Sequence, residues 1–151
     1  MFLLFQINPI TEMMRTHDWI FPAGECVHIA LFAPAVGTIA ATDLSLLGIG
    51  FPRKSAPQLV RGTEIWAMTA LVIIIFSGLL LFSIDPDLYY LNRAFQFKMI
   101  CLVLAIIFNY TIHRKVAVAV DGSPGAAKLV AVISLVLWAG VIFGGLFIAF
   151  Q

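Results

Sequence analysis

Four long apolar stretches run along the chain, and short polar or proline-containing links separate them. A bilayer core about 30 Å thick is crossed by a helix of roughly 20 apolar residues. The hydropathy pattern therefore predicts four membrane-spanning helices, over about residues 21–47, 65–82, 97–112 and 127–150. Because the links are short, neighbouring helices are expected to run antiparallel, which makes the fold class an all-α integral membrane four-helix up-down bundle.

Helix-breaking residues mark the ends of these stretches. The links contain Gly48, Gly50 and Pro52 after the first stretch, Asp85-Pro86-Asp87 after the second, and His113-Arg114-Lys115 after the third. Ser123 is the expected N-cap of the fourth helix, with Pro124 at its first helical position.

Residues 1–18 form an N-terminal segment ahead of the four-helix part, residues 19–151. Its first five residues are too short for the apolar region of a signal peptide, and no basic residue precedes them. After Asn8-Pro9, apolar residues recur at helical spacing, at Ile10, Met13 and Met14. This pattern predicts a short amphipathic helix that lies at the membrane interface.

Composition supports a membrane protein. The chain is 62% hydrophobic and only 11% charged, with a mean hydropathy of +1.03, whereas a soluble domain is about half apolar and a quarter charged. A net charge of +1 offers no basic patch for nucleic acid. The two cysteines, Cys26 and Cys101, are too few for a disulfide scaffold, and whether they bridge is left open.

Basic residues predict the orientation. One side of the membrane receives Arg53, Lys54, Arg61, Arg114, Lys115 and Lys128, and the other receives Arg15, Arg93 and Lys98. By the positive-inside rule, both termini are expected outside, on the periplasmic side of a bacterial inner membrane.

Ionisable residues occur inside two of the predicted spans, where they are costly and therefore informative. In the first span, Glu25 and Asp43 share one azimuth at about 100° per residue, with His28 about 60° away. In the third span, Lys98, Asn109 and His113 also share a face. These two faces are expected to point into the bundle.

The first and third helices run in the same direction in an up-down bundle, so their polar groups are expected to meet at two depths. Glu25 and His28 would lie near Lys98 at the outer end. Asp43 would lie near Asn109 and either His113 or Arg114 at the inner end. The simplest interpretation is structural, because such ion pairs would fix the register of the two helices.

A metal site is one alternative. Glu25 and His28 are spaced i, i+3, as in di-iron carboxylate bundles, but those proteins need two such motifs and further glutamates. A single transition metal bound by His17, Asp18, Glu25 and His28 remains a candidate.

Haem b or a quinone is the other alternative. His28 and His113 are separated by roughly 20 Å in depth, so they cannot hold one iron together. His28 would need Met99, His17 or a partner subunit for the second ligand. His113 and Arg114 could hold a haem propionate or a quinone head group.

Short motifs stand at the ends of the predicted helices: Glu25-x-x-His28, Asp43-Leu44-x-Leu46-Leu47-Gly48, Gly78-Leu79-Leu80-Leu81-Phe82, Asn92-x-x-Phe95-x-x-Lys98 and His113-Arg114. Together they resemble a family of small bacterial four-helix inner-membrane proteins of unknown function. The layout is more loosely similar to the copper-resistance membrane protein D group and to cytochrome-b-like bundles. The resemblance covers about Trp19 to the end, with Ser45 where the family pattern has arginine. It implies a fold and a membrane location by analogy, but no reaction.

Three functions follow from these observations. The preferred one is a subunit of an electron-transfer membrane complex, whose cofactor-binding candidates are Glu25, His28, Lys98, Met99 and His113. The others are a structural or assembly subunit without chemistry, and a metal-binding protein that uses His17, Glu25 and His28. Membrane lipid and either other membrane subunits or further copies of the chain are the expected partners. Independent enzymatic activity is not expected, because no nucleophile and base are placed to meet.

Overall fold

The computed structural model describes residues 9–50, 52, 55–119 and 123–150, and every regular element among them is helical. In chain order these elements are α2 (Pro9–Thr16), α3 (Ile20–Leu47), α4 (Ala56–Ile84), α5 (Pro86–Leu91), α6 (Arg93–Phe108), the π-helical turn η2 (Asn109–His113), α7 (Arg114–Val118), α8 (Pro124–Phe147) and the 3₁₀ turn η3 (Ile148–Phe150). Four of the described segments are long and apolar enough to cross a membrane: α3, α4, the continuous run 93–118, and α8.

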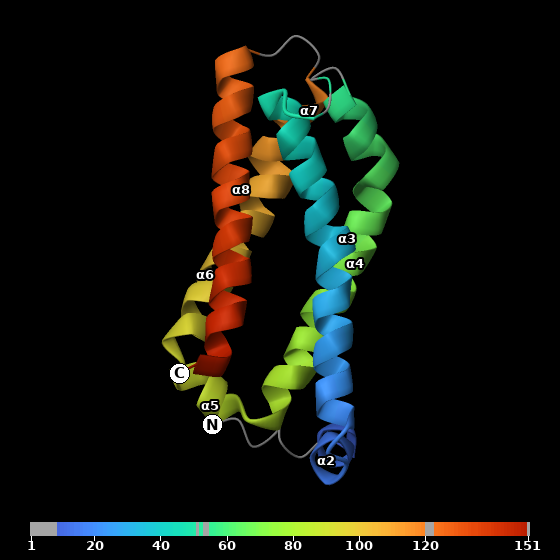
Figure 1. Cartoon of the computed structure of the whole chain (residues 1–151), viewed down its shortest axis with the longest axis vertical. Helices are drawn as coiled ribbons and strands as arrows, with labels where there is room; N and C mark the ends of the chain where they lie inside the picture. The colour runs from blue at the N-terminus through green and yellow to red at the C-terminus, as the bar shows by residue number, and fades with distance from the viewer. Residues whose placement is uncertain (1–8, 51, 53–54, 120–122, 151) are drawn as a thin grey trace.

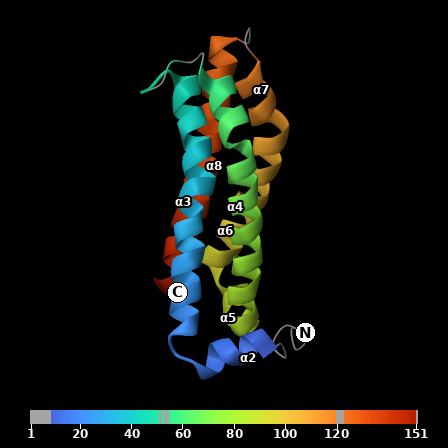
Figure 2. The same cartoon turned by 90° about the vertical axis from the view of Figure 1, so that its right-hand side faces the viewer.

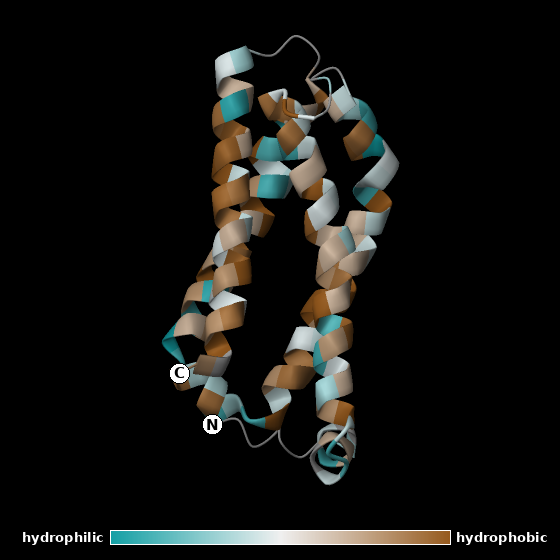
Figure 3. Ribbon diagram, in the orientation of Figure 1, coloured by the Kyte–Doolittle hydropathy of each residue, from teal (hydrophilic) through white to brown (hydrophobic). Residues whose placement is uncertain are grey.

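The four long segments form an up-down bundle (Figures 1 and 2). We call the end that carries α2, α5 and the C-terminal end of α8 the terminal end, and the end where α3 and α7 finish and α4 and α8 begin the loop end. Apolar residues cover the long helices along most of their length (Figure 3). The predicted all-α bundle with four apolar helices is confirmed, and the chain is a multi-pass membrane protein.

Each helix packs against two neighbours around the bundle. α3 contacts α4 and α8, α6 contacts α8, and α7 contacts α4. α3 and α6 therefore lie diagonally across the bundle instead of side by side. Of the two predicted meetings of their polar residues, only the inner one forms a direct contact, between Asp43 and His113, because only side chains that reach across the bundle centre can connect the two helices.

Two spans are longer than their hydropathy predicted. The second begins at Ala56 instead of near residue 65, because Pro57 is accepted in the first helical turn and charged residues are tolerated at a helix end near the membrane surface. The third runs from residue 93 to residue 118. It begins directly after Asn92, whose side chain accepts a hydrogen bond from the Phe95 N–H at 3.0 Å.

The short helices close the terminal end. The predicted helix after Asn8-Pro9 is present as α2, whose Thr11 hydroxyl lies 3.0 Å from that of Ser83 in α4. Asp85 caps α5 by accepting the Leu88 N–H at 3.2 Å. Pro124 opens α8 as predicted, but Ser123 makes no side-chain capping bond.

The core has a large-residue layer and a small-residue layer. Buried residues of the middle layer include Ile39, Leu71, Cys101, Trp138 and Val141. Towards the loop end the core consists of Leu46 of the first span and of alanines from the other three spans, Ala56, Ala117, Ala127 and Ala131. Small side chains let the helices approach closely there, which brings polar groups of three helices within hydrogen-bonding distance.

Candidate functional site

A buried polar network connects three helices near the loop end. His113 Nε2 of η2 lies 2.6 Å from Asp43 Oδ1 of α3, and Ser134 Oγ of α8 donates to Asp43 Oδ2 at 2.7 Å. Asp43 and Ser134 are almost fully buried, and His113 is 3% exposed. The predicted Asp43–His113 pair is therefore present. Ser134 was missed, although a hydroxyl within an apolar stretch was the available signal.

A π-helical turn brings the third span into this network. The Arg114 N–H bonds to the Asn109 carbonyl five residues earlier, which is the π-helical pattern. Asn109 and His113 are both buried in consequence. Asn109 Oδ1 has no hydrogen-bond partner among the described residues, so the predicted proximity to Asp43 does not give Asn109 a direct bond with it.

The network does not activate a nucleophile. Both Ser134 and His113 bond to Asp43, and they do not bond to each other within the described chain. A serine nucleophile requires a base within hydrogen-bond reach of its hydroxyl. This arrangement instead satisfies a buried carboxylate on both of its oxygens.

A small cleft lies beside the network, between α3, α4 and η2. Its volume is about 40 Å³, and its polar lining includes Thr42, Thr63, Glu64, Asn109 and His113. A bound water needs roughly 10–15 Å³ of such space, so the cleft can hold a few water molecules. A haem or quinone ring is much larger, so His113 does not face a cofactor-sized cavity here.

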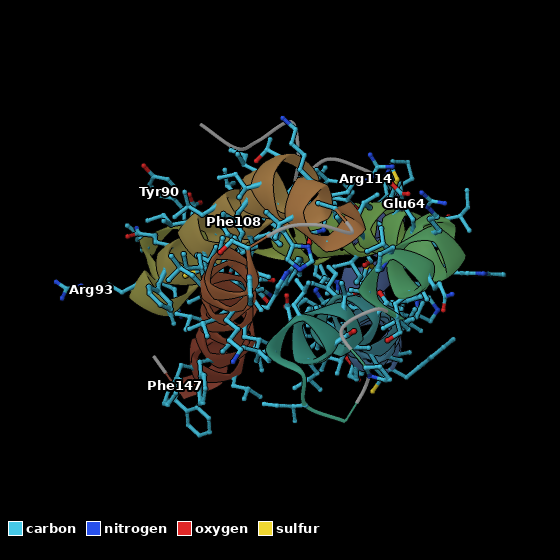
Figure 4. All side chains as sticks on the ribbon, turned by 90° about the horizontal axis from the view of Figure 1, so that it is seen from above. Glu64, Tyr90, Arg93, Phe108, Arg114 and Phe147 are labelled. Carbon is cyan, nitrogen blue, oxygen red and sulfur yellow. The ribbon has the colours of Figure 1, made fainter. Side chains whose placement is uncertain are left out.

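Arg114 closes the outer side of this cleft with a partner that the sequence did not suggest. Its Nε lies 2.7 Å from Glu64 Oε1 of α4, and Figure 4 shows the two side chains together. The alternative pairing of Arg114 with Asp43 is therefore wrong. Glu64 was missed because it lies just ahead of the stretch that hydropathy assigned to the second span.

A second group of polar residues lies nearer the terminal end, around His28 of α3. His28 Nδ1 lies 2.8 Å from Ser77 Oγ of α4, and the Ser77 hydroxyl donates to the Ile74 carbonyl at 3.1 Å. When the single hydroxyl proton is used on that carbonyl, Nδ1 donates to Ser77 Oγ. In the neutral ring, Nε2 then carries a free lone pair.

Glu25 and Lys98 do not form the predicted direct pair: the described ion pairs within 4.0 Å are His113–Asp43 and Arg114–Glu64. Lys98 lies along Gly144 and Gly145 of α8, because α6 packs on α8 and not on α3. Glu25 is exposed instead of facing the bundle, as a carboxylate near a helix end can remain in water. Lys98 still interacts electrostatically with Glu25 and His28.

The other predicted ligands are not gathered around His28. His17 is exposed after α2, with Nδ1 3.2 Å from the Met13 carbonyl, and Met99 is 40% exposed on α6. No three His, Cys, Asp or Glu side chains converge on a metal position in the described ranges. The proposed set of His17, Glu25 and His28 is thus not assembled within the chain, since α2 turns away along α4. Cys26 is exposed, Cys101 is buried, and both are free thiols.

The chain belongs to DUF6644, a family of unknown function, whose model matches residues 10–151. No curated protein and no solved structure matches the chain. The family assignment agrees with the resemblance to a membrane family of unknown function that the motifs indicated, and it attaches no reaction to the site.

Proposed function

We propose that this chain is a small subunit of a membrane electron-transfer complex, in which His28 binds a haem b. The observation that carries the proposal is the orientation of the His28 ring. With Nδ1 donating to Ser77 Oγ at 2.8 Å, the free Nε2 lone pair is the form of imidazole that binds iron. Metal-binding histidines commonly donate the other ring N–H to a protein acceptor, which fixes both tautomer and orientation.

The surroundings of His28 fit one axial ligand. Gly78 makes room for the ring, because a Cβ there would lie 3.1 Å from His28 Cε1. A quinone carbonyl needs a hydrogen-bond donor, which a neutral Nε2 is not, so haem is favoured over quinone at this position. Any second axial ligand would come from a partner subunit or a second copy of the chain.

The charges near His28 suit the rest of a haem. Lys98 interacts electrostatically with His28 and could pair with a propionate. Bound haem would supply one-electron transfer. The protein would orient the imidazole through Ser77 and keep it against α4 through Gly78.

The test is an oxidised-minus-reduced visible spectrum of the gently solubilised protein with its co-purifying chains retained. We expect a haem band in the wild type that is lost in His28→Ala and shifted in Ser77→Ala. His17→Ala is the matched control, because His17 lies exposed outside the bundle, and it should keep the band. A featureless wild-type spectrum, or a band that survives His28→Ala, would overturn the proposal.

A structural or assembly subunit is the second candidate. It is favoured by the buried network near the loop end, in which Asp43 has both oxygens bonded within the chain. Such a network fixes helix register without binding anything. If the chain has this role, we expect it to purify in a stable, colourless complex with other membrane subunits. A purified protein that is monomeric and free of other chains would count against the structural role.

We further propose a bacterial inner membrane with the terminal end on the periplasmic side. Arg61, Arg114, Lys115 and Lys128 lie towards the loop end, and the terminal end has Arg15, Arg93 and Lys98. The positive-inside rule places the more basic end in the cytoplasm. A reporter enzyme that is active only in the periplasm should be active when it is fused after residue 151. Activity of a cytoplasm-specific reporter at the same position would show the opposite orientation.

A further inference from the structure

The threonines that line the cleft beside the buried network offer hydrogen-bond acceptors. The hydroxyls of Thr38, Thr42 and Thr63 donate to carbonyls of their own helices, at 3.0 Å to Pro34, 3.1 Å to Thr38 and 2.7 Å to Leu59. A hydroxyl has one proton, so each threonine can only accept a further hydrogen bond. A molecule that bonds to these threonines must therefore be able to donate.

Among the described residues, one buried oxygen of η2 next to this cleft lacks a partner, and a ring nitrogen of His113 is unbonded. Asn109 Oδ1 is buried without a donor. His113, four residues later on the same helical face, bonds Asp43 through Nε2, and within the described chain nothing bonds its Nδ1. Both residues line the cleft. Buried polar atoms in proteins nearly always have a partner, either protein or ordered water.

The size and charge of the cleft identify the occupant. Its volume of about 40 Å³ accommodates a small number of water molecules, each of which needs roughly 10–15 Å³ of such space. A metal cation is disfavoured, since the Arg114 guanidinium lines the cleft and already pairs with Glu64. Water can donate to Asn109 Oδ1 and still bond to His113 Nδ1.

We propose that this cleft holds an ordered water that bridges Asn109 Oδ1 and His113 Nδ1 and lets the buried Asp43–His113 pair exchange protons with the loop end. The ionisable groups around His113 are Asp43 on α3, Glu64 on α4, Tyr110 on η2 and Arg114 on α7, whereas α8 contributes the hydroxyl of Ser134. The proposal concerns the loop end of the bundle and does not depend on haem at His28.

Pulsed hydroxyl-radical labelling with mass spectrometry tests for the water, because radiolysis of a bound water oxidises the side chain beside it. The internal control is Cys101, which is also buried but packs against Gly140 away from the cleft. After correction for intrinsic reactivity, we expect His113 to be oxidised severalfold faster than Cys101. Equal or slower oxidation of His113 would overturn the proposal.

Variants and proton exchange give a second, independent readout. Asn109→Leu has nearly the same shape but cannot accept the water, so His113 oxidation and deuterium exchange at its C2–H should both slow severalfold. Thr111→Val, in the same turn but exposed, should leave both rates unchanged. Rates that are unaffected by Asn109→Leu would overturn the proposal. If Asn109→Leu fails to fold, the wild-type comparison of His113 with Cys101 decides it.

Discussion

Gly144 of α8 lies directly against the backbone of Lys98 in α6. A Cβ built at Gly144 would approach Lys98 Cβ to 2.9 Å, Cα to 3.0 Å and N to 3.1 Å. Backbone atoms cannot move aside without moving the helix, so the absence of a side chain sets how closely α6 and α8 pack. Small residues at such crossings are the usual means of close helix packing in membranes.

Gly144→Ala should therefore destabilise the bundle by about 1–3 kcal/mol, the range typical of overpacking. Thermal unfolding in detergent would measure the loss. Gly37→Ala is the matched control, because a Cβ there would have no neighbour within 4 Å and alanine is the better helix former. A stability loss at Gly37 equal to that at Gly144 would contradict the steric explanation.

Gly140, one turn earlier in α8, faces a side chain instead of a backbone. Its added Cβ would lie 2.9 Å from Cys101 Sγ and 3.5 Å from Cys101 Cβ. Gly140→Ala should destabilise the protein, and adding Cys101→Ala should recover part of that loss by removing the sulfur. The two changes should thus be non-additive in unfolding measurements, as expected for residues in contact. Strict additivity would show that the contact does not limit packing.

Asp43 should be among the most sensitive positions of the chain. Asp43→Ala leaves His113 and Ser134 without their buried acceptor, and losing one partner of a buried pair typically costs about 3–5 kcal/mol. Arg114→Gln removes an ion pair whose arginine side chain is 52% exposed, so the expected loss of stability is much smaller than that of Asp43→Ala. Comparable losses in the two variants would argue that the Asp43 network is solvated.

The spans were predictable because membrane-spanning helices are read from composition and length alone. The predicted first span, about 21–47, nearly coincides with α3, and the contact of Asp43 with His113 followed from helical azimuths. Azimuths give direction but not distance. They therefore placed Glu25 opposite Lys98 without showing that α6 would pack on α8 and carry Lys98 to Gly144.

Other parts of the site depend on features that a sequence does not display. The π-helical turn at Asn109 changes which residues face inward, and the sequence of the turn, Asn-Tyr-Thr-Ile-His, does not predict it. The contact of Ser77 with His28 depends on the packing of α3 against α4. The sequence does not indicate it, because many serines in membrane helices bond only to their own backbone. The long-range partners of single hydroxyls thus required the three-dimensional arrangement.

Tyr89, in the short α5 between two spans, should ionise late. Burial, and then the negative charges of Glu25 and Asp85, raise the pKa of its phenol above the ordinary value. The folded state therefore holds this proton more tightly than the unfolded state, so the associated stability is present below the unfolded pKa and is lost as pH rises through the folded pKa.

A spectrophotometric phenolate titration of the wild type minus Tyr89→Phe would isolate this group. We expect the midpoint of the difference curve above the model-peptide value of about 10. Tyr89→Phe should also lose less stability than the wild type at high pH. A midpoint at or below the ordinary pKa of tyrosine would show that Tyr89 is solvated and that its contacts with Phe82 and Phe95 do not persist in solution.

Gly78 gives the most direct test of how His28 is held. A Cβ at this position would lie 3.1 Å from His28 Cε1, which is tight but relievable by a small ring movement. Gly78→Ala should therefore leave unfolding nearly unchanged while it displaces the ring from Ser77 Oγ. If His28 binds haem, the visible band should shift and the midpoint potential should change, because the orientation and hydrogen bonding of an axial ligand tune the metal. Gly62→Ala, in the same helix but with open space around its Cβ, should change neither. A haem signal insensitive to Gly78→Ala would place the haem away from His28.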